Sequence, residues 1–313
     1  MIGSYGGPVV KPFRFALQGR NFAERDAVIA MARQAEALGY EELYSADHIG
    51  AADPFAPLIV AAEATTHLRV GPLVLNNEFH QPALLARTAA TVDRLTGGRL
   101  VLGIGTGYAQ EEHDAIGVQL REPSARVDRF EESVTAIGAL LDTGAAHLEG
   151  THHQLDVDDL GVRPAQDHVP LLIGGYGRRV VGIAGRHADI FQFTGLTHGE
   201  GGQLSPGGFA IEQVRERANW LAASAGDRID DIECSTLVQV TYVGADAAAE
   251  VKKTAERFGV SAHLIEETPF LLIGSLEEVV DKLERLREDV GITHVVVRDG
   301  EGFAPVVAAL AGR

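Results

Sequence analysis

Short apolar runs alternate with longer stretches of helical periodicity along almost the whole chain. Each run has the length of a buried strand, and the stretch after it repeats apolar residues every three or four positions. This alternation predicts parallel strands joined by crossover helices, which is the pattern of a (β/α)8 TIM barrel in the α/β class. We expect residues 1–313 to form one such domain. The predicted strands are Phe13–Gly19, Leu43–His48, Arg69–Asn76, Leu100–Gly105, Leu171–Gly174, Ile190–Thr194, Ile232–Val243 and His294–Val297.

The stretches between these runs carry recognisable helix ends. Asn21 and Glu24 have the spacing of a capping box before the first helix. Pro82 suits the first position of a helix, because its missing N–H is not needed there. Ser275 and Glu278 form a second capping box near the end of the chain. Helices are therefore predicted from local end signals as well as from hydrophobicity.

Two segments interrupt the alternation. Residues 142–169 contain several glycines and little periodicity, and we expect this excursion between the fourth and fifth strands to pass over the barrel mouth. Thr197–Gly208 is a second irregular stretch, which follows the sixth strand. The mouth, formed by the C-terminal ends of the strands, is where barrel enzymes place their active sites.

Composition and charge limit the expected location and partners of the protein. Hydrophobic residues make up 45% of the chain and Cys234 is its one cysteine, so no disulfide framework is predicted. The sequence begins without a signal-peptide pattern, and no apolar stretch approaches the ~20 residues that span a bilayer. The net charge of −17 disfavours nucleic acid and anionic membranes as partners. We therefore expect a cytoplasmic protein that acts on a small molecule.

Polar and glycine-rich residues gather at the C-terminal ends of the predicted strands. They are Gln18, Asp47, His48, Asn76, Asn77, Gly105–Tyr108, Gly174–Gly177 and Thr194. Each of the two glycine-rich turns leads into a helix, where backbone N–H groups can bind a phosphate, and Arg178 and Arg179 add positive charge to the second. Either turn alone is also compatible with a tight connection that binds nothing. Asp47 and His48 can equally be a polar pair that closes a strand, although histidine is well suited to exchange a proton near neutral pH.

The predicted strands lack the residues that several other types of barrel enzyme require. No lysine falls at a predicted strand end, which argues against a Schiff-base enzyme. The first strand, FRFALQG, has no histidine ligands, so no metal site is predicted. The glycines around Thr106 do not continue into a dinucleotide-binding motif.

Taken in order, the motifs resemble the bacterial luciferase-like superfamily, and in particular its branch that uses coenzyme F420, an 8-hydroxy-5-deazaflavin. The resemblance covers nearly the whole chain, and each motif is loose on its own. It is carried by YSADHI, LRVGPLVLNN, DRLTGGRLVLGIGTGY, RVDRFEE, VPLLIGGYG, AGRHADIF, IGSLEEVVDKL and GITHVVV.

The resemblance implies a cofactor at the barrel mouth. Asp47 would contact the deazaflavin ring, and His48 would be the proton donor or acceptor. Leu73–Val74 would be a non-prolyl cis peptide behind the ring, and Asn76 would face its pyrimidine edge. The remaining implied cofactor-binding residues, most of them on the phosphate side, are Thr106, Gly107, Tyr108, Gly175, Tyr176, Gly177, Arg179 and Val180.

The sequence also departs from this family pattern. Similar sugar-phosphate dehydrogenases place a catalytic Glu directly after the Gly-Thr-Gly turn, where this chain has Tyr108, and a Lys after the sixth strand, which FTGLTHG lacks. Glucose 6-phosphate is therefore not the expected substrate. The expected reaction is hydride transfer between F420 and an unidentified small organic substrate. The alternatives are an FMN-dependent monooxygenase that uses O2 and reduced flavin from a partner reductase, and a non-catalytic flavin-binding barrel. Related barrels imply a homodimer.

Overall fold

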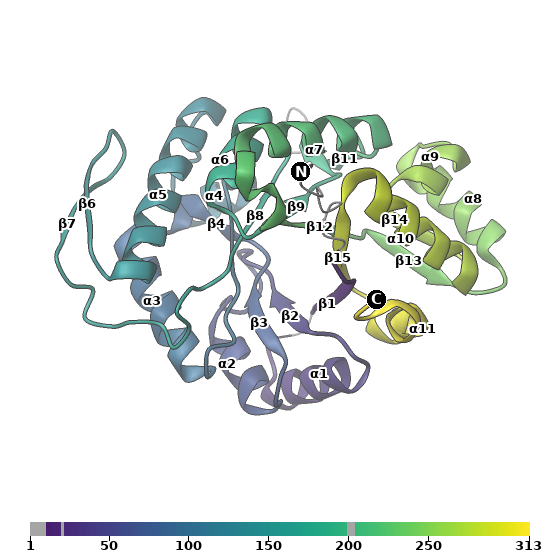
Figure 1. Ribbon diagram of the computed structural model, residues 1–313, viewed down its shortest axis with the longest axis horizontal. Helices are drawn as coiled ribbons and strands as arrows, with labels where there is room; N and C mark the ends of the chain where they lie inside the picture. Colours follow the sequence, from purple (N-terminus) through teal and green to yellow (C-terminus); the bar gives the residue numbers. More distant parts are fainter. Residues whose placement is uncertain (1–10, 20–21, 199–203) are drawn as a thin grey trace, which may run out of the picture.

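A computed structural model describes residues 11–19, 22–198 and 204–313, and its centre is a ring of parallel strands surrounded by helices (Figure 1). Neighbouring strands follow the order β3-β2-β1-β15-β12-β9-β8-β5-β4. β3 and β4 stand at the two ends of this order but are consecutive in the chain, so nine strands occupy eight barrel positions. The strands are β1 (Arg14–Gln18), β2 (Glu42–Ser45), β3 (Arg69–Pro72), β4 (Leu75–Asn76), β5 (Leu102–Gly105), β8 (Leu171–Gly175), β9 (Ile190–Phe193), β12 (Glu233–Leu237) and β15 (Ile292–Val297). The predicted barrel is confirmed.

Three predicted strands differ from the observed ones. The run Arg69–Asn76 is interrupted, with β3 ending at Pro72 and β4 beginning at Leu75. The run Ile232–Val243 is divided, because β12 stays in the barrel while β13 (Val240–Val243) turns outward to pair with β14 (Leu271–Gly274), a strand that was not predicted. The apolar alternation continues through this bend, so the sequence pattern does not reveal it. The second strand ends at Ser45, which places Asp47 and His48 in the loop that follows.

The helices confirm some predicted ends and correct one. In the second capping box, the Glu278 N–H donates to Ser275 Oγ and the Ser275 N–H donates to Glu278 Oε2, and Pro82 stands at the start of α3. The first capping box is wrong, because Glu24 is itself the N-cap of α1, while Asn21 lies outside the described residues. The helices are α1 (Arg25–Ala37), α2 (Ala56–Glu63), α3 (Pro82–Leu95), α4 (Gln110–Ile116), α5 (Pro123–Thr143), α6 (Arg178–His187), α7 (Ile211–Ala225), α8 (Ala247–Phe258), α9 (Ala262–Glu267), α10 (Leu276–Val290) and α11 (Gly300–Leu310), with 3-10 turns η1 (Asn77–Phe79) and η3 (Gly226–Asp230). Among the described residues, no helix is long and apolar enough to cross a membrane.

Alternate residues of each strand point into the barrel and form layers. On β1, Arg14 lies at the amino end and pairs with Glu42 and Glu233, which close the barrel floor. Above this layer, a small apolar cluster fills the barrel interior: Ala16, Tyr44, Leu73, Val101, Leu172, Ile190 and Val296. Gln18, the next inward residue of β1, reaches the mouth. The barrel interior is therefore packed below its mouth.

The excursion is not where the sequence pattern placed it. It forms a hairpin of β6 (Ala146–Glu149) and β7 (Gln154–Val157) that lies beyond α5 (Figure 1). The N–H groups of its turn donate to Glu132 on α5, and the Gln166 amide binds Asp93 and the Leu100 carbonyl at the amino ends of the strands. The predicted passage over the barrel mouth is wrong, because α5 runs antiparallel to its strand and delivers the chain to the amino end. The second irregular segment includes the short pair β10 (Thr197–His198) and β11 (Leu204–Ser205); residues 199–203 lie outside the described part.

Candidate active site at the barrel mouth

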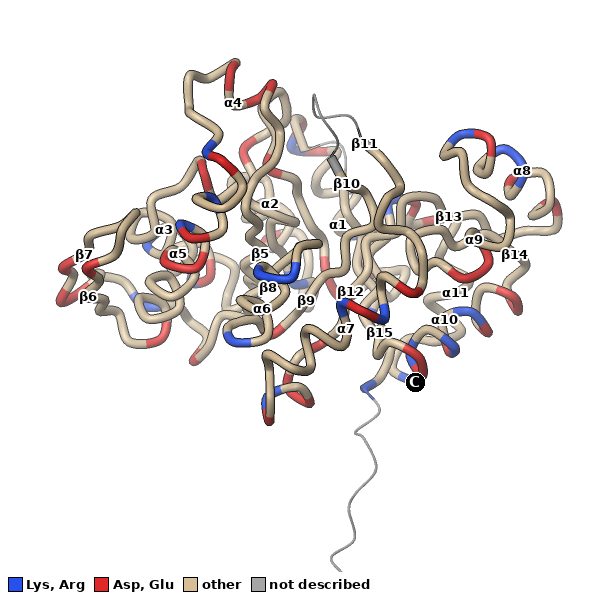
Figure 2. Tube along the Cα trace, turned by 90° about the horizontal axis from the view of Figure 1, so that it is seen from above, with Lys and Arg blue, Asp and Glu red and all other residues tan. Residues whose placement is uncertain are grey.

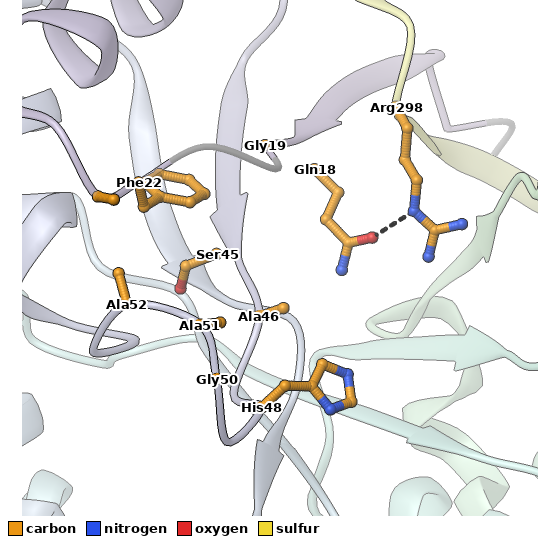
Figure 3. A pocket seen from close by; sticks show the side chains of 11 residues that line it. Gln18, Gly19, Phe22, Ser45, Ala46, His48, Gly50, Ala51, Ala52 and Arg298 are labelled. Atoms are coloured by element: carbon orange, nitrogen blue, oxygen red, sulfur yellow. Dashed lines mark hydrogen bonds between the residues drawn. The ribbon is translucent and has the colours of Figure 1, made fainter.

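Two inward-facing side chains form the floor of the mouth. The Gln18 amide donates from Nε2 to the Leu73 carbonyl at 2.9 Å. Its Oε1 accepts a hydrogen bond of 2.8 Å from Nε of Arg298, the residue after β15 (Figure 3). Arg298 also donates from Nη1 to Gln239 Oε1 at 2.9 Å. These bonds fix both ends of the Gln18 amide and hold a guanidinium at the entrance to the barrel.

A cavity of about 380 Å³ opens above this floor, beside β1 and β2. Its wall combines small or apolar residues with a few polar side chains, which is the make-up of a small-molecule pocket. His48 projects at its edge, opposite Gln18 and Arg298 (Figure 3). The lining residues are Gln18, Gly19, Phe22, Ala23, Ser45, Ala46, His48, Gly50, Ala51, Ala52 and Arg298.

Asp47 and His48 face different partners. Asp47 Oδ2 accepts a hydrogen bond of 2.8 Å from the Asn76 N–H and lies 3.2 Å from Nε2 of His80, so the carboxylate ties its loop to β4. His48 is partly exposed, and its Nδ1 lies 2.7 Å from Oε1 of Glu112 on α4. The structure therefore brings the predicted pair to the mouth, with only His48 on the cavity wall.

β4 and the first glycine turn fit closely together. The Leu73–Val74 peptide is cis, as the family resemblance implied. The Asn76 amide accepts from the Glu78 N–H at 3.1 Å, and its Nδ2 lies 2.9 Å from Nε2 of His113 on α4. Gly107 has φ +80°, and a Cβ there would lie 2.0 Å from Asn76 Oδ1. This position requires glycine for its backbone conformation and for the close approach of Asn76.

Tyr108, which follows this turn, presents its ring edge to His48, with 6.1 Å between ring centroids. Burial raises the pKa of the Tyr108 phenol above 10; the Glu112 carboxylate adds to this shift and Arg298 opposes it. The phenol is therefore protonated at neutral pH and can donate a hydrogen bond. Thr106, the other predicted residue of this turn, is half-buried.

The second glycine turn lies across the mouth from the cavity, because β8 is four positions from β1 around the ring. Gly175 ends β8, and a Cβ there would lie 2.4 Å from a methyl group of Val180 in the first turn of α6. Gly177 is the N-cap of α6 and, among the described residues, no side chain caps the first N–H groups of this helix. These donors, together with the positive end of the helix dipole, suit an anionic group.

The charged residues beside this turn are held by neighbours. Arg179 pairs with Asp128 on α5, and Arg178 lies over the Trp220 ring. The guanidinium of Arg217 lies 4.7 Å from the centroid of the Tyr176 ring and donates to the carbonyls of Gly208 and Gln213. Burial lowers the pKa of Arg217 to about 10. Tyr176 is thus fixed by a buried cation that the sequence analysis did not identify.

Four residues that shape the mouth were not singled out from the sequence: Glu112, His113, Arg217 and Arg298. Arg298 had a detectable signal, because His294, Val296 and Arg298 alternate on the inward face of β15. Glu112 and His113 belong to α4, whose seven residues are too few for a clear helical period. In the described ranges, no group of three or more His, Cys, Asp or Glu side chains is placed to hold a metal ion.

The site thus lies at the mouth of a parallel α/β barrel, with a partly polar cavity on one side and the Gly177 start of α6 on the other. The luciferase-like monooxygenase family matches residues 9–269, and the chain belongs to this family. The predicted resemblance is therefore confirmed, and the chain is an enzyme of the luciferase-like class.

The chain is similar to several F420-dependent enzymes and to a monooxygenase. The F420-dependent glucose-6-phosphate dehydrogenase of Amycolatopsis mediterranei is 28% identical over 293 residues, covering 91% of this chain and 83% of the relative. The 5,10-methylenetetrahydromethanopterin reductase of Archaeoglobus fulgidus is 29% identical over 50% of this chain and 45% of its own length. An F420-dependent secondary alcohol dehydrogenase in complex with an F420-acetone adduct superposes with a TM-score of 0.75 at 19% identity, covering 95% of this chain and 99% of that one. The long-chain alkane monooxygenase LadA superposes with a TM-score of 0.77 at 15% identity, covering 96% of this chain and 91% of that one. The two structures show the shared fold.

Proposed function

We propose that this enzyme is an F420-dependent oxidoreductase that transfers hydride between the deazaflavin and a small organic substrate, with His48 as the group that donates or accepts the proton. The observation that carries the proposal is the set of F420-dependent relatives. Three of them, from different organisms, are 28% identical over 85–91% of this chain. The predicted cofactor agrees with the names of these relatives.

The residues of the mouth fit this cofactor. The uncapped N–H groups at the start of α6 can receive its phosphate, and Gly177 leaves open space there, because a Cβ at this position would have no described atom within 4 Å. The cavity beside His48 is large enough for a small substrate next to a planar ring. The residues proposed to bind the cofactor are Asp47, Leu73, Val74, Asn76, Thr106, Gly107, Tyr108, Gly175, Tyr176, Gly177, Arg179 and Val180.

The chemistry that bound F420 supplies is the transfer of two electrons as hydride. Reduction of a carbonyl to an alcohol needs a proton as well, and His48 is placed on the cavity wall to provide it. In the reverse direction, His48 accepts the alcohol proton. Arg298 and the neutral Tyr108 phenol act as hydrogen-bond donors that orient the substrate oxygen.

Titration of the purified protein with F420 and, separately, with FMN tests this proposal. We expect saturable quenching of F420 fluorescence. Tight FMN binding without F420 binding would overturn the choice of cofactor and favour an FMN-dependent monooxygenase, which the family description and the fold shared with the alkane monooxygenase keep as the second candidate.

Two arginines of α6 provide a matched pair of variants. Arg179 at the start of the helix pairs with Asp128, and Arg186 at its end pairs with Glu131, both on α5 and both about half exposed. We expect Arg179→Ala to weaken F420 binding about tenfold, the effect of one charge-assisted contact, whereas Arg186→Ala leaves it unchanged. Equal losses in both variants would place the cofactor phosphate elsewhere.

The proposal also includes the predicted cellular setting. The enzyme acts in the cytoplasm as a homodimer, and in the direction that reduces the substrate a separate reductase supplies its reduced cofactor. Light scattering coupled to size-exclusion chromatography tests the dimer, and a monomeric mass at micromolar concentration would contradict it.

A further inference from the structure

One carboxylate from α4 holds the segment that carries His48. Glu112 Oε1 lies 2.7 Å from Nδ1 of His48, and Oε2 accepts a hydrogen bond of 3.2 Å from the backbone N–H of Ile49. The two oxygens of Glu112 thus contact adjacent residues of one loop. α4 stands on the mouth side of the barrel, on the same side as β10 and β11 (Figure 2).

α4 is itself anchored at the next residue. His113 is fully buried, its Nε2 lies 2.9 Å from Asn76 Nδ2, and its Nδ1 lies 3.1 Å from the Val118 carbonyl. The His113 ring also packs against Phe79, with 4.7 Å between centroids. The Glu112 side chain is 21% exposed, so the carboxylate is fixed by its helix rather than free to swing in solvent.

The hydrogen-bonding capacity of these groups determines where the proton on His48 resides. An ionised carboxylate can only accept, so the Nδ1 that faces it must carry hydrogen. The neutral ring then has a bare Nε2, and this nitrogen is left to exchange a proton in the cavity. The same logic orients catalytic imidazoles elsewhere, where a buried carboxylate selects one tautomer.

We propose that Glu112 is a positioning residue that keeps the proton of His48 on Nδ1, so that Nε2 is the atom that exchanges the proton with the substrate. This inference rests on the proposed function, in which His48 handles the proton of the hydride transfer. Glu112 touches neither substrate nor cofactor and acts through His48.

Two substitutions of Glu112 separate this role from a merely structural one. In Glu112→Gln, the Ile49 N–H still requires an acceptor, so the amide oxygen faces Ile49 and the NH2 group faces Nδ1. The neutral ring must then carry its hydrogen on Nε2, the wrong tautomer for accepting a proton. In Glu112→Ala, the ring is released and both tautomers are available. We therefore expect Gln, although isosteric, to reduce kcat about tenfold more than Ala.

The kinetic test compares these two variants with Glu111→Gln, which makes the same charge change one residue earlier on exposed α4 surface. The expected order of kcat is wild type and Glu111→Gln together, then Glu112→Ala, then Glu112→Gln, with KM and F420 affinity little changed. A purely structural role predicts that Gln is milder than Ala, and that order would overturn the proposal.

A second readout needs neither cofactor nor substrate. In ligand-free protein with 15N-labelled histidine, the His48 signals are identified by their loss in His48→Ala. The proposal predicts a neutral wild-type ring protonated on Nδ1 and a Glu112→Gln ring protonated on Nε2. A wild-type ring protonated on Nε2 refutes the proposal even if F420 binds. Conversely, if F420 fails to bind while the Nδ1–H tautomer is found, the proposed function fails and the role of Glu112 in setting the tautomer stands.

Discussion

Gly107→Ala should damage both stability and cofactor binding, because the glycine meets two requirements at once. Its φ of +80° is unfavourable for any other residue, which costs alanine about 1–2 kcal/mol. The new Cβ would also lie 2.0 Å from Asn76 Oδ1, so the buried amide must move. That movement breaks its contacts with the Glu78 N–H and His113, at a cost of about 1–3 kcal/mol for a buried group left unsatisfied. The expected loss in the free energy of unfolding is therefore about 2–5 kcal/mol.

Gly117→Ala is the matched control for this loss. Gly117 ends α4 with φ +69°, and a Cβ there has no described atom within 4 Å. It should therefore cost only the backbone term of about 1–2 kcal/mol. Urea denaturation followed by the fluorescence of Trp220, the single tryptophan, measures both variants. F420 titration should show weaker binding for Gly107→Ala alone. Equal stabilities and equal affinities would refute the role assigned to the contact between Gly107 and Asn76.

Two buried ionisable groups give further predictions from pH dependence. Burial alone would lower the pKa of His294, but the Glu42 carboxylate at 2.6 Å outweighs it and raises the pKa above 6.5. The stability that this pair contributes is fully present below pH 6.5 and is lost as the pH rises through the pKa of folded His294. The difference in Tm between wild type and His294→Gln should therefore shrink from pH 6 to pH 9. A difference in Tm that stays constant over this range would exclude the linkage. Burial lowers the pKa of Lys282 to about 7 from 10.5, so between these pH values the unfolded chain binds more protons and stability rises with pH. Lys282→Met lacks this rise and leaves the carbonyls of Ile265 and Leu271 without their hydrogen-bond donor. Its free energy of unfolding, measured in urea, should therefore fall further below that of wild type from pH 7 to pH 10. The same pH dependence in variant and wild type would contradict the lowered pKa of Lys282.

The barrel was predictable because its strands are buried on both faces and therefore consist of nearly continuous apolar residues. The same signal failed where geometry rather than hydrophobicity decides the path of the chain. β13 leaves the barrel without a break in the pattern, and the hairpin of β6 and β7 lies beside α5 because a helix returns the chain to the amino end of the barrel. Neither event changes the local composition in a way that a single sequence reveals.

In the candidate site, too, some residues could be predicted from the sequence and others could not. Strand ends marked His48, Asn76 and Gly107, because parallel strands bring their carboxyl ends to one mouth. Partners that reach these residues from distant elements had no such marker. Glu112 meets His48 across 64 positions of sequence, and that pairing depends on how α4 is placed over the mouth. Contacts of this kind follow from the folded arrangement and not from the spacing of residue types.

A crystal structure of the protein with F420 bound tests the central claim most directly. We predict that the deazaflavin ring lies against the Leu73–Val74 peptide, that its phosphate binds the N–H groups at the start of α6, and that Nε2 of His48 is directed to the cavity beside the ring. A cofactor whose ring lies away from His48, or whose phosphate is held by residues other than those around Gly177, would contradict this claim.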